Sequence, residues 1–73
     1  MQKWEYTELS VDENLDEFGY VENISAWLNG TQTLLKVVPS VLYEYLNKLG
    51  EKGWELIAIR TSPLRYYFKR PKM

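Results

Sequence analysis

The stretch "GEKGWELIAIR" (residues 50–60) joins a helix pattern to a strand pattern, and its two glycines offer two places for the helix to end. In the Schellman motif a glycine with positive φ ends the helix, and the residue after it contacts one five positions earlier. With Gly53 in that position, the contacting pair would be Trp54 and Leu49. With Gly50 there, the pair would be a glutamate and a leucine, which is a poor match. We therefore expect the helix to end at Gly53, which makes the stretch a structural corner rather than a ligand loop.

The residues before this corner carry the pattern of a single helix. Pro39 disfavours the α conformation in the residue before it, so the helix is expected to begin at Val38-Pro39-Ser40. The Ser40 hydroxyl is the predicted cap. Apolar residues then recur at one-turn spacings and form one stripe, which consists of Val41, Leu42, Tyr45, Leu46 and Leu49. The pattern predicts one helix of about 13 residues with a single apolar face.

Two strands are expected after the corner. They are "WELIAIRT" (residues 54–61) and, beyond the turn "SPL", "RYYFKR" (residues 65–70). In the first strand, alternation predicts two faces: Trp54, Leu56 and Ala58 on one, and Glu55, Ile57 and Ile59 on the other. In the last strand it places Tyr66, Phe68 and Arg70 on one face and Arg65, Tyr67 and Lys69 on the opposite one.

The N-terminal half predicts three further strands. "KWEYTELSV" (residues 3–11) alternates as a half-buried strand does, whereas the acidic "DENLDEFG" (residues 12–19) is typical of a loop. Asn29-Gly30 supplies the positive φ angles that a type I′ hairpin turn needs. We expect the arms of this hairpin near residues 23–28 and 31–35.

Together these elements predict a single α+β domain over residues 1–73. Its architecture would be one antiparallel sheet of about five strands, in the order β-ββ-α-ββ, with a single helix packed on one face. A chain of 73 residues buries only roughly 60% of its unfolded surface. It contains neither cysteine nor histidine, which excludes disulfides and the usual zinc ligands. Stability must therefore come from its eleven aromatic residues or from association with another chain.

The sequence also predicts where the protein works. No apolar stretch approaches the roughly 20 residues of a membrane span, and the N-terminal "MQKWE" lacks an apolar signal region. We therefore expect a cytoplasmic protein with no membrane partner.

The near-zero net charge hides an asymmetry between the two halves. Residues 1–35 hold one basic and seven acidic residues, whereas residues 36–73 hold eight basic and three acidic ones. Such halves can pair within one fold or between two subunits, or they can form a solvated surface of mixed charge. A basic strand edge for a polyanion is a further possibility.

Three motifs resemble a known family. "KWEY" near the start, "YLNKLGEKGWELIAI" in the middle and "YYFKRP" at the end resemble a family of small prokaryotic and phage domains of unknown function. Members of that family carry W-E-Y, then L-N-x-L-G-x-x-G-W-E-L, then an aromatic strand that closes in Y-F-K-R-P. The likeness covers about half the chain and leaves residues 12–38 uncovered. It implies a small α+β domain in a bacterial or phage context, and it supplies no reaction, ligand or site.

Nothing in the sequence predicts catalysis, a cofactor or a metal site. General acid–base chemistry favours histidine or a carboxylate tuned by burial, and the carboxylates here fall mostly in the expected loop or on exposed faces. Asp12, Asn14 and Asp16 alternate as at the start of a calcium loop, which then needs glycine at position 17 and an acid at position 23. The chain has Glu17 and Asn23 instead, so we predict a non-enzymatic protein.

The last strand offers the main candidate interaction surface. Arg60, Arg65, Tyr67 and Lys69 are predicted on one sheet face, where aromatic rings can stack on bases and cations can hold phosphates. The strand lacks the glycines of the RNA-recognition signature, and a net charge of −1 weakens the case for nucleic acid. The same pattern fits core packing and protein association, so three interpretations stay open.

The uncovered face of the sheet favours association. One helix covers only one face, and both alternating sets of the first and fourth strands are substantially apolar. We predict an interaction or regulatory module that forms a symmetric homodimer through the open face or joins a larger protein partner. The alternative is a nucleic-acid-binding module that uses Arg60, Arg65, Tyr67 and Lys69.

Overall fold

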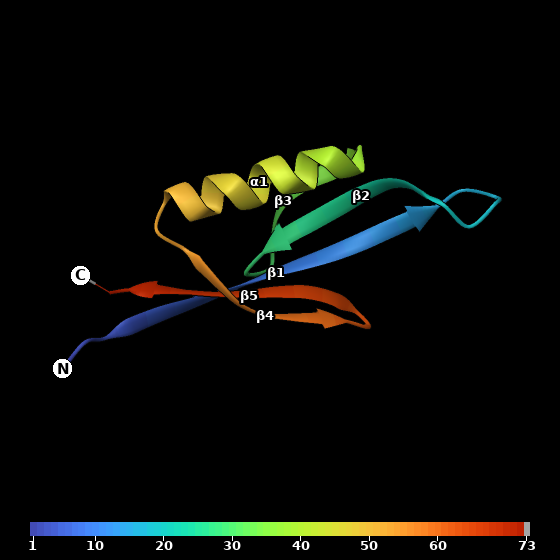
Figure 1. Cartoon of the computed structure of the whole chain (residues 1–73). Coiled ribbons are helices and arrows are strands. Elements are labelled where there is room, and N and C mark those ends of the chain that lie inside the picture. The colour runs from blue at the N-terminus through green and yellow to red at the C-terminus, as the bar shows by residue number, and fades with distance from the viewer. Residues whose placement is uncertain (73) are drawn as a thin grey trace.

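The computed structural model describes residues 1–72, and within them one helix lies on one antiparallel sheet (Figure 1). The elements in chain order are β1 (Trp4–Leu15), β2 (Val21–Leu28), β3 (Thr31–Val37), α1 (Pro39–Glu51), β4 (Glu55–Thr61) and β5 (Leu64–Pro71). The strands lie side by side in the order β3-β2-β1-β5-β4, and all neighbours are antiparallel. The predicted α+β fold and the order β-ββ-α-ββ are confirmed.

The core lies between α1 and one side of the sheet, which we call the helix face. β1 is the central strand, and its Leu9 is fully buried. The residues that form the core are Leu9, Val11, Ile24, Ala26 and Phe68 from the sheet and Leu42 and Leu49 from the helix. Tyr45 and Leu46 pack against this cluster, so the predicted apolar stripe of the helix is the buried one. Each fully buried aliphatic or aromatic side chain contributes about 1.5–3 kcal/mol to stability.

The helix covers only part of that face. It packs on β2, and Figure 1 shows α1 above the β2 and β3 side of the sheet, while β4 emerges at the opposite edge. All seven residues of β4 are exposed as a consequence. Among the described residues no helix lies on the opposite side of the sheet, which we call the open face.

The first strand is longer than predicted. The expected loop over residues 12–19 is wrong for residues 12–15, because β1 continues to Leu15 and pairs there with β2. Asp and Asn disfavour strands on their own, yet here the partner strand supplies the ladder and Asn14 donates to Asn23 at 2.6 Å. The connection shrinks to residues 16–20, where the Asp16 carboxylate accepts hydrogen bonds from the backbone N–H groups of Phe18 and Tyr20.

The hairpin turn at Asn29-Gly30 is confirmed. The two residues have φ angles of 49° and 84°, which are the positive values that a type I′ turn requires. Its second arm is two residues longer than predicted and ends at Val37, with register irregularities against β2.

The helix begins within the predicted segment Val38-Pro39-Ser40, but its cap residue differs from the prediction. Val38 is the N-cap and Pro39 occupies the first turn, with no side-chain hydrogen bond at the cap. The predicted role of Ser40 as the cap is therefore wrong, because Ser40 already lies inside the helix. Proline suits this position, since its fixed φ matches the helix and its missing N–H has no intrahelical partner there.

The helix ends where the sequence predicts. Gly53 has a φ of 89°, and the N–H of Trp54 donates to the carbonyl of Leu49 at 3.0 Å. The N–H of Gly53 donates to the carbonyl of Gly50, also at 3.0 Å. These two bonds are the Schellman pair, and Trp54 packs against the core that contains Leu49. The stretch 50–60 is confirmed as a corner.

The predicted faces of β4 are wrong beyond Leu56. Leu56 lies opposite Phe68 and Ala58 opposite Tyr67, so Ile57 is an extra residue that forms a bulge. A bulge shifts the alternation by one position. Ile59, opposite Tyr66, therefore shares the helix face with Leu56, and Ala58 joins Glu55 on the open face.

We expect Gly53→Ala to lower the free energy of unfolding by more than about 1 kcal/mol. The cause would be backbone strain alone, because an added Cβ would meet no atom within 4 Å. Gly50 is the matched control, since it lies in α1 without a positive φ and in equally open space. Gly50→Ala should raise stability by up to about 1 kcal/mol. Denaturant titrations would measure both, and equal effects would contradict the helix stop at Gly53.

Candidate functional site

The open face brings together the four residues of the predicted surface. Arg65, Tyr67 and Lys69 alternate along β5, and Arg60 of β4 lies directly opposite Arg65. β1 adds Glu8 opposite Tyr67 on the other side of β5. The bulge in β4 is what keeps Arg60 on this face, so the grouping depends on tertiary pairing.

Most of the cations on this face already have partners. The guanidinium of Arg65 forms an ion pair with Glu8, whose carboxylate also accepts a hydrogen bond from the Ser10 hydroxyl at 3.1 Å. The ammonium of Lys69 lies 4.3 Å from the ring centroid of Trp4, a cation–π geometry. Among residues 1–72, Arg60 forms neither kind of contact. The face is thus less free to bind an anion than its basic composition indicates.

A shallow depression lies beside these residues on the open face. Its lining is Tyr6, Thr7, Glu8, Asn29 and Tyr67, and its volume is about 270 Å³. The hairpin turn closes one side, because Asn29 exchanges hydrogen bonds with Glu8 through its amide oxygen and its backbone N–H. The only charged lining residue is Glu8, so the depression has no cation with which to hold a phosphate.

Exposed apolar side chains form one group around the β1–β2 connection, at Leu15, Phe18 and Tyr20, and another on β4. Leu56, Ile57 and Ile59 remain 44%, 46% and 54% exposed. We call the seven residues of this strand, Glu55–Thr61, the β4 edge, because no strand within residues 1–72 pairs with β4 on its outer side.

The part of the helix face next to β4 is only half closed. Tyr66 on β5 is partly buried, and Tyr43 on α1 is 65% exposed. Burial raises the pKa of the Tyr66 phenol above its ordinary value, with smaller contributions from Tyr43 and Glu13. Tyr66 lies opposite Ile59 of β4 and opposite Leu9 of β1, so it connects the β4 edge to the core.

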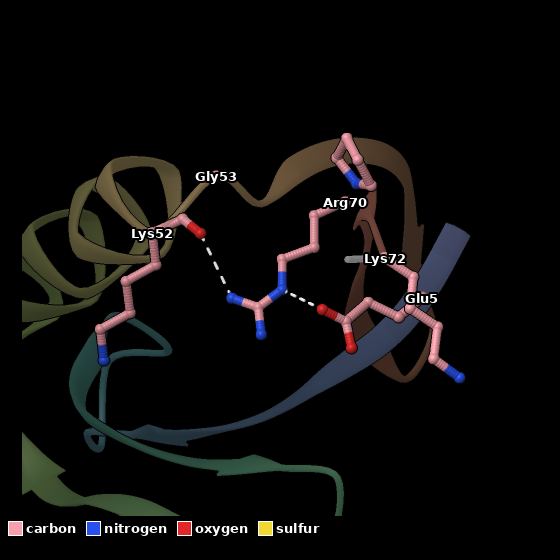
Figure 2. A pocket seen from close by; sticks show the side chains of 6 residues that line it. Glu5, Lys52, Gly53, Arg70 and Lys72 are labelled. Atoms are coloured by element: carbon pink, nitrogen blue, oxygen red, sulfur yellow. Dashed lines mark hydrogen bonds and ion pairs between the residues drawn. The ribbon is translucent and has the colours of Figure 1, made fainter. Parts of the chain in front are cut away.

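A second hollow lies at the end of the helix, where Arg70 holds the corner. Figure 2 shows the guanidinium of Arg70 between the carbonyl of Lys52, at 3.2 Å, and the carboxylate of Glu5, with which it forms an ion pair. The same guanidinium lies 4.2 Å from the ring centroid of Trp54. The hollow measures about 540 Å³ and is also lined by Gly53, Pro71 and Lys72.

These contacts make Arg70 a clamp rather than a ligand group. A cation at a helix C-terminus complements the helix macrodipole. The charge of Arg70 is already paired with the carboxylate of Glu5. The same dipole disfavours a bound anion in the hollow. Sequence reasoning missed this role of Arg70, although alternation had placed it beside Tyr66 and Phe68 on the face that proved to be buried.

The rest of residues 1–72 offers no arrangement with obvious chemistry. No group of three or more acidic side chains is placed to hold a metal ion within this part of the chain. The only helix found among these residues is too short to cross a membrane.

Comparisons with known proteins add no relative. The chain matches no protein-family model, no curated protein and no solved structure. The resemblance to the small prokaryotic and phage domains stays a prediction, and functional inference must come from the surfaces themselves.

We expect Arg70→Ala to lower the free energy of unfolding by about 1–2 kcal/mol, because it removes an ion pair, a hydrogen bond to the helix end and a cation–π contact. Arg65→Ala is the matched control, since Arg65 keeps a single ion pair on the same strand. That change should cost less than about 1 kcal/mol. Denaturant unfolding of the two variants would show the difference, and a larger cost for Arg65→Ala would contradict the clamp.

Proposed function

We propose that this chain is a small protein-interaction module that self-associates and has no chemistry of its own. The observation that supports it is the β4 edge, a seven-residue strand with every residue exposed. Exposed apolar side chains beside an unpaired main-chain edge favour pairing with another chain. The resemblance to prokaryotic and phage domains and the absence of cysteine favour a cytoplasmic, bacterial or phage setting.

β3, the strand at the other edge of the sheet, has features that protect an edge against pairing with another chain. β3 pairs irregularly with β2, Lys36 has a positive φ of 47°, and the strand opens with Thr31, Gln32 and Thr33. Irregular backbone, lysine and polar residues all discourage pairing at an edge. β4 has a bulge at Ile57, but it contains neither lysine nor proline and its centre is apolar. It is therefore the edge that is better suited to association.

Because the chain is small, the exposed apolar residues of β4 reduce its stability noticeably. A small domain buries a low fraction of its apolar surface, and binding to the folded state adds to its stability by mass action. Association through β4 would therefore stabilise the fold as well as create a specific contact.

Sedimentation equilibrium from low micromolar to millimolar protein tests the proposal. We expect a reversible dimer, and we expect Ile59→Lys to shift it towards monomer. Phe18→Lys is the matched control, because Phe18 is also an exposed apolar residue, at 76%, but lies between β1 and β2, neither of which borders β4. A monomer over the whole range, or equal weakening by both substitutions, would contradict self-association through β4.

A second candidate function rests on the register of the open face. Arg60, Arg65, Tyr67 and Lys69 share that face beside Trp4 and Tyr6, which is the mixture of cations and aromatic rings that binds single-stranded nucleic acid. The ion pair between Glu8 and Arg65 counts against it, so we rank it below protein association.

Fluorescence anisotropy with a single-stranded oligonucleotide tests this second function. If the face binds, the affinity must fall linearly with salt on a logarithmic scale, and Arg60→Gln should reduce the slope by about 0.7. Lys48→Gln is the control, because Lys48 lies in the last turn of α1. No binding at low salt, or equal effects of the two substitutions, would exclude the open face as a nucleic-acid site.

A further inference from the structure

The β4 edge is complementary to itself when two copies run antiparallel. Its first six residues are "ELIAIR" (residues 55–60), with an acid at one end, a base at the other and apolar residues between them. A two-fold axis in the middle would place the acid of each strand opposite the base of the other. Opposite charges directly across a strand pair stabilise it, and like charges destabilise it.

The bulge makes this complementarity possible on both faces. A two-fold axis perpendicular to a sheet keeps each side chain on its own face, so only residues that share a face can become partners. Without the extra Ile57, residues 56 and 59 would point to opposite faces. With it, Leu56 and Ile59 both lie on the helix face.

The same argument holds for the charged ends. Glu55 and Arg60 both lie on the open face, opposite Lys69 and Arg65 of β5. Each has a single strand neighbour, because β5 borders β4 on one side only. Within residues 1–72, neither takes part in an ion pair, and both are exposed.

We propose that β4 pairs with β4 of a second copy, antiparallel, about a two-fold axis through the bulge. Glu55 then lies opposite Arg60 of the second copy on the open face, and Leu56 lies opposite its Ile59 on the helix face. The two sheets become one continuous sheet of ten strands. This pairing rests on the proposed function, since it specifies how the module associates with itself.

Neighbouring registers lose these matches. An axis through Leu56 would pair that residue with itself and leave Arg60 without a partner strand. An axis through Ile59 would pair Leu56 with Thr61 and leave Glu55 unmatched. The register centred on the bulge is the one that satisfies both charges and both large apolar residues of the helix face.

The proposed contact is short, which sets the expected strength. It involves one strand from each copy and the apolar side chains around it, so its area falls at the low end of specific interfaces, below about 1,200 Å². A reversible dimer is therefore expected rather than an obligate one.

Charge reversal tests the register. Glu55→Arg places two bases opposite each other at both ends of the pairing, and Arg60→Glu places two acids there. We expect each single variant to weaken the homodimer by about tenfold or more in sedimentation equilibrium. An equimolar mixture of the two single variants should form a heterodimer, because every end then pairs an acid with a base. The double variant Glu55→Arg/Arg60→Glu should form a homodimer again.

The double variant and the mixture guard against loss of folding, since recovery of a dimer requires folded chains. If the wild type dimerises but charge reversal has no effect, or if the mixture stays monomeric, the register is wrong and the second copy sits elsewhere, for example on the open face. If the wild type is monomeric to millimolar concentration, the proposed self-association itself fails. The two failures are therefore distinct.

Discussion

One short helix cannot cover a sheet of five strands, and the exposed surfaces of this protein follow from that limit. Five strands spaced about 4.8 Å apart span roughly 20 Å between the outer axes, whereas a helix with its side chains is about 10–12 Å across. α1 packs on β2, and the strand order places β4 at the opposite edge. Leu56 and Ile59 point to the helix face at that edge, yet no helix reaches them. Apolar groups that need cover therefore lie beside the helix at this edge, in addition to Trp4 and Tyr6 on the open face.

The corner after the helix determines how β4 is presented. The left-handed residue Gly53 ends the helix, and the clamp of Arg70 on Trp54 and on the carbonyl of Lys52 holds the turn against β5 and β1. β4 then leaves the corner along the outer side of β5. The bulge at Ile57 resets its alternation, so that an acid and a base flank the strand on one face and two apolar residues on the other. Local backbone geometry thus sets the chemistry of the whole edge.

The unequal halves of the chain are matched inside the fold. β1, from the acidic half, lies antiparallel to β5, from the basic half, and this pairing joins Glu5 to Arg70 and Glu8 to Arg65. Partly exposed pairs of this kind add little stability each, but they engage two of the cations that would otherwise attract a polyanion. The basic composition of the last strand therefore overstates its capacity for nucleic acid. Of the three cations on the open face, Arg60 is the one without an ion pair or cation–π contact among residues 1–72. It lies at the edge where a second chain is proposed to bind.

Features that a few neighbouring residues control could be predicted from the amino-acid sequence. These are the element order, the type I′ turn at Asn29-Gly30, the apolar stripe of the helix and its stop at Gly53, because each depends on backbone angles or spacings within one or two turns. The alternation of β5 was also predictable, which is why Arg65, Tyr67 and Lys69 were grouped correctly.

Contacts between distant segments set the extension of β1 to Leu15, the bulge at Ile57, the role of Arg70 and the exposure of β4. Each depends on a partner far away in the chain. β2 supplies hydrogen bonds to residues 12–15, which disfavour strands on their own. The register shift against β5 moves the side chains after Ile57 to the opposite face. Pairings between distant segments leave no local pattern, so the surface proposed for function emerged only when the strands were placed side by side.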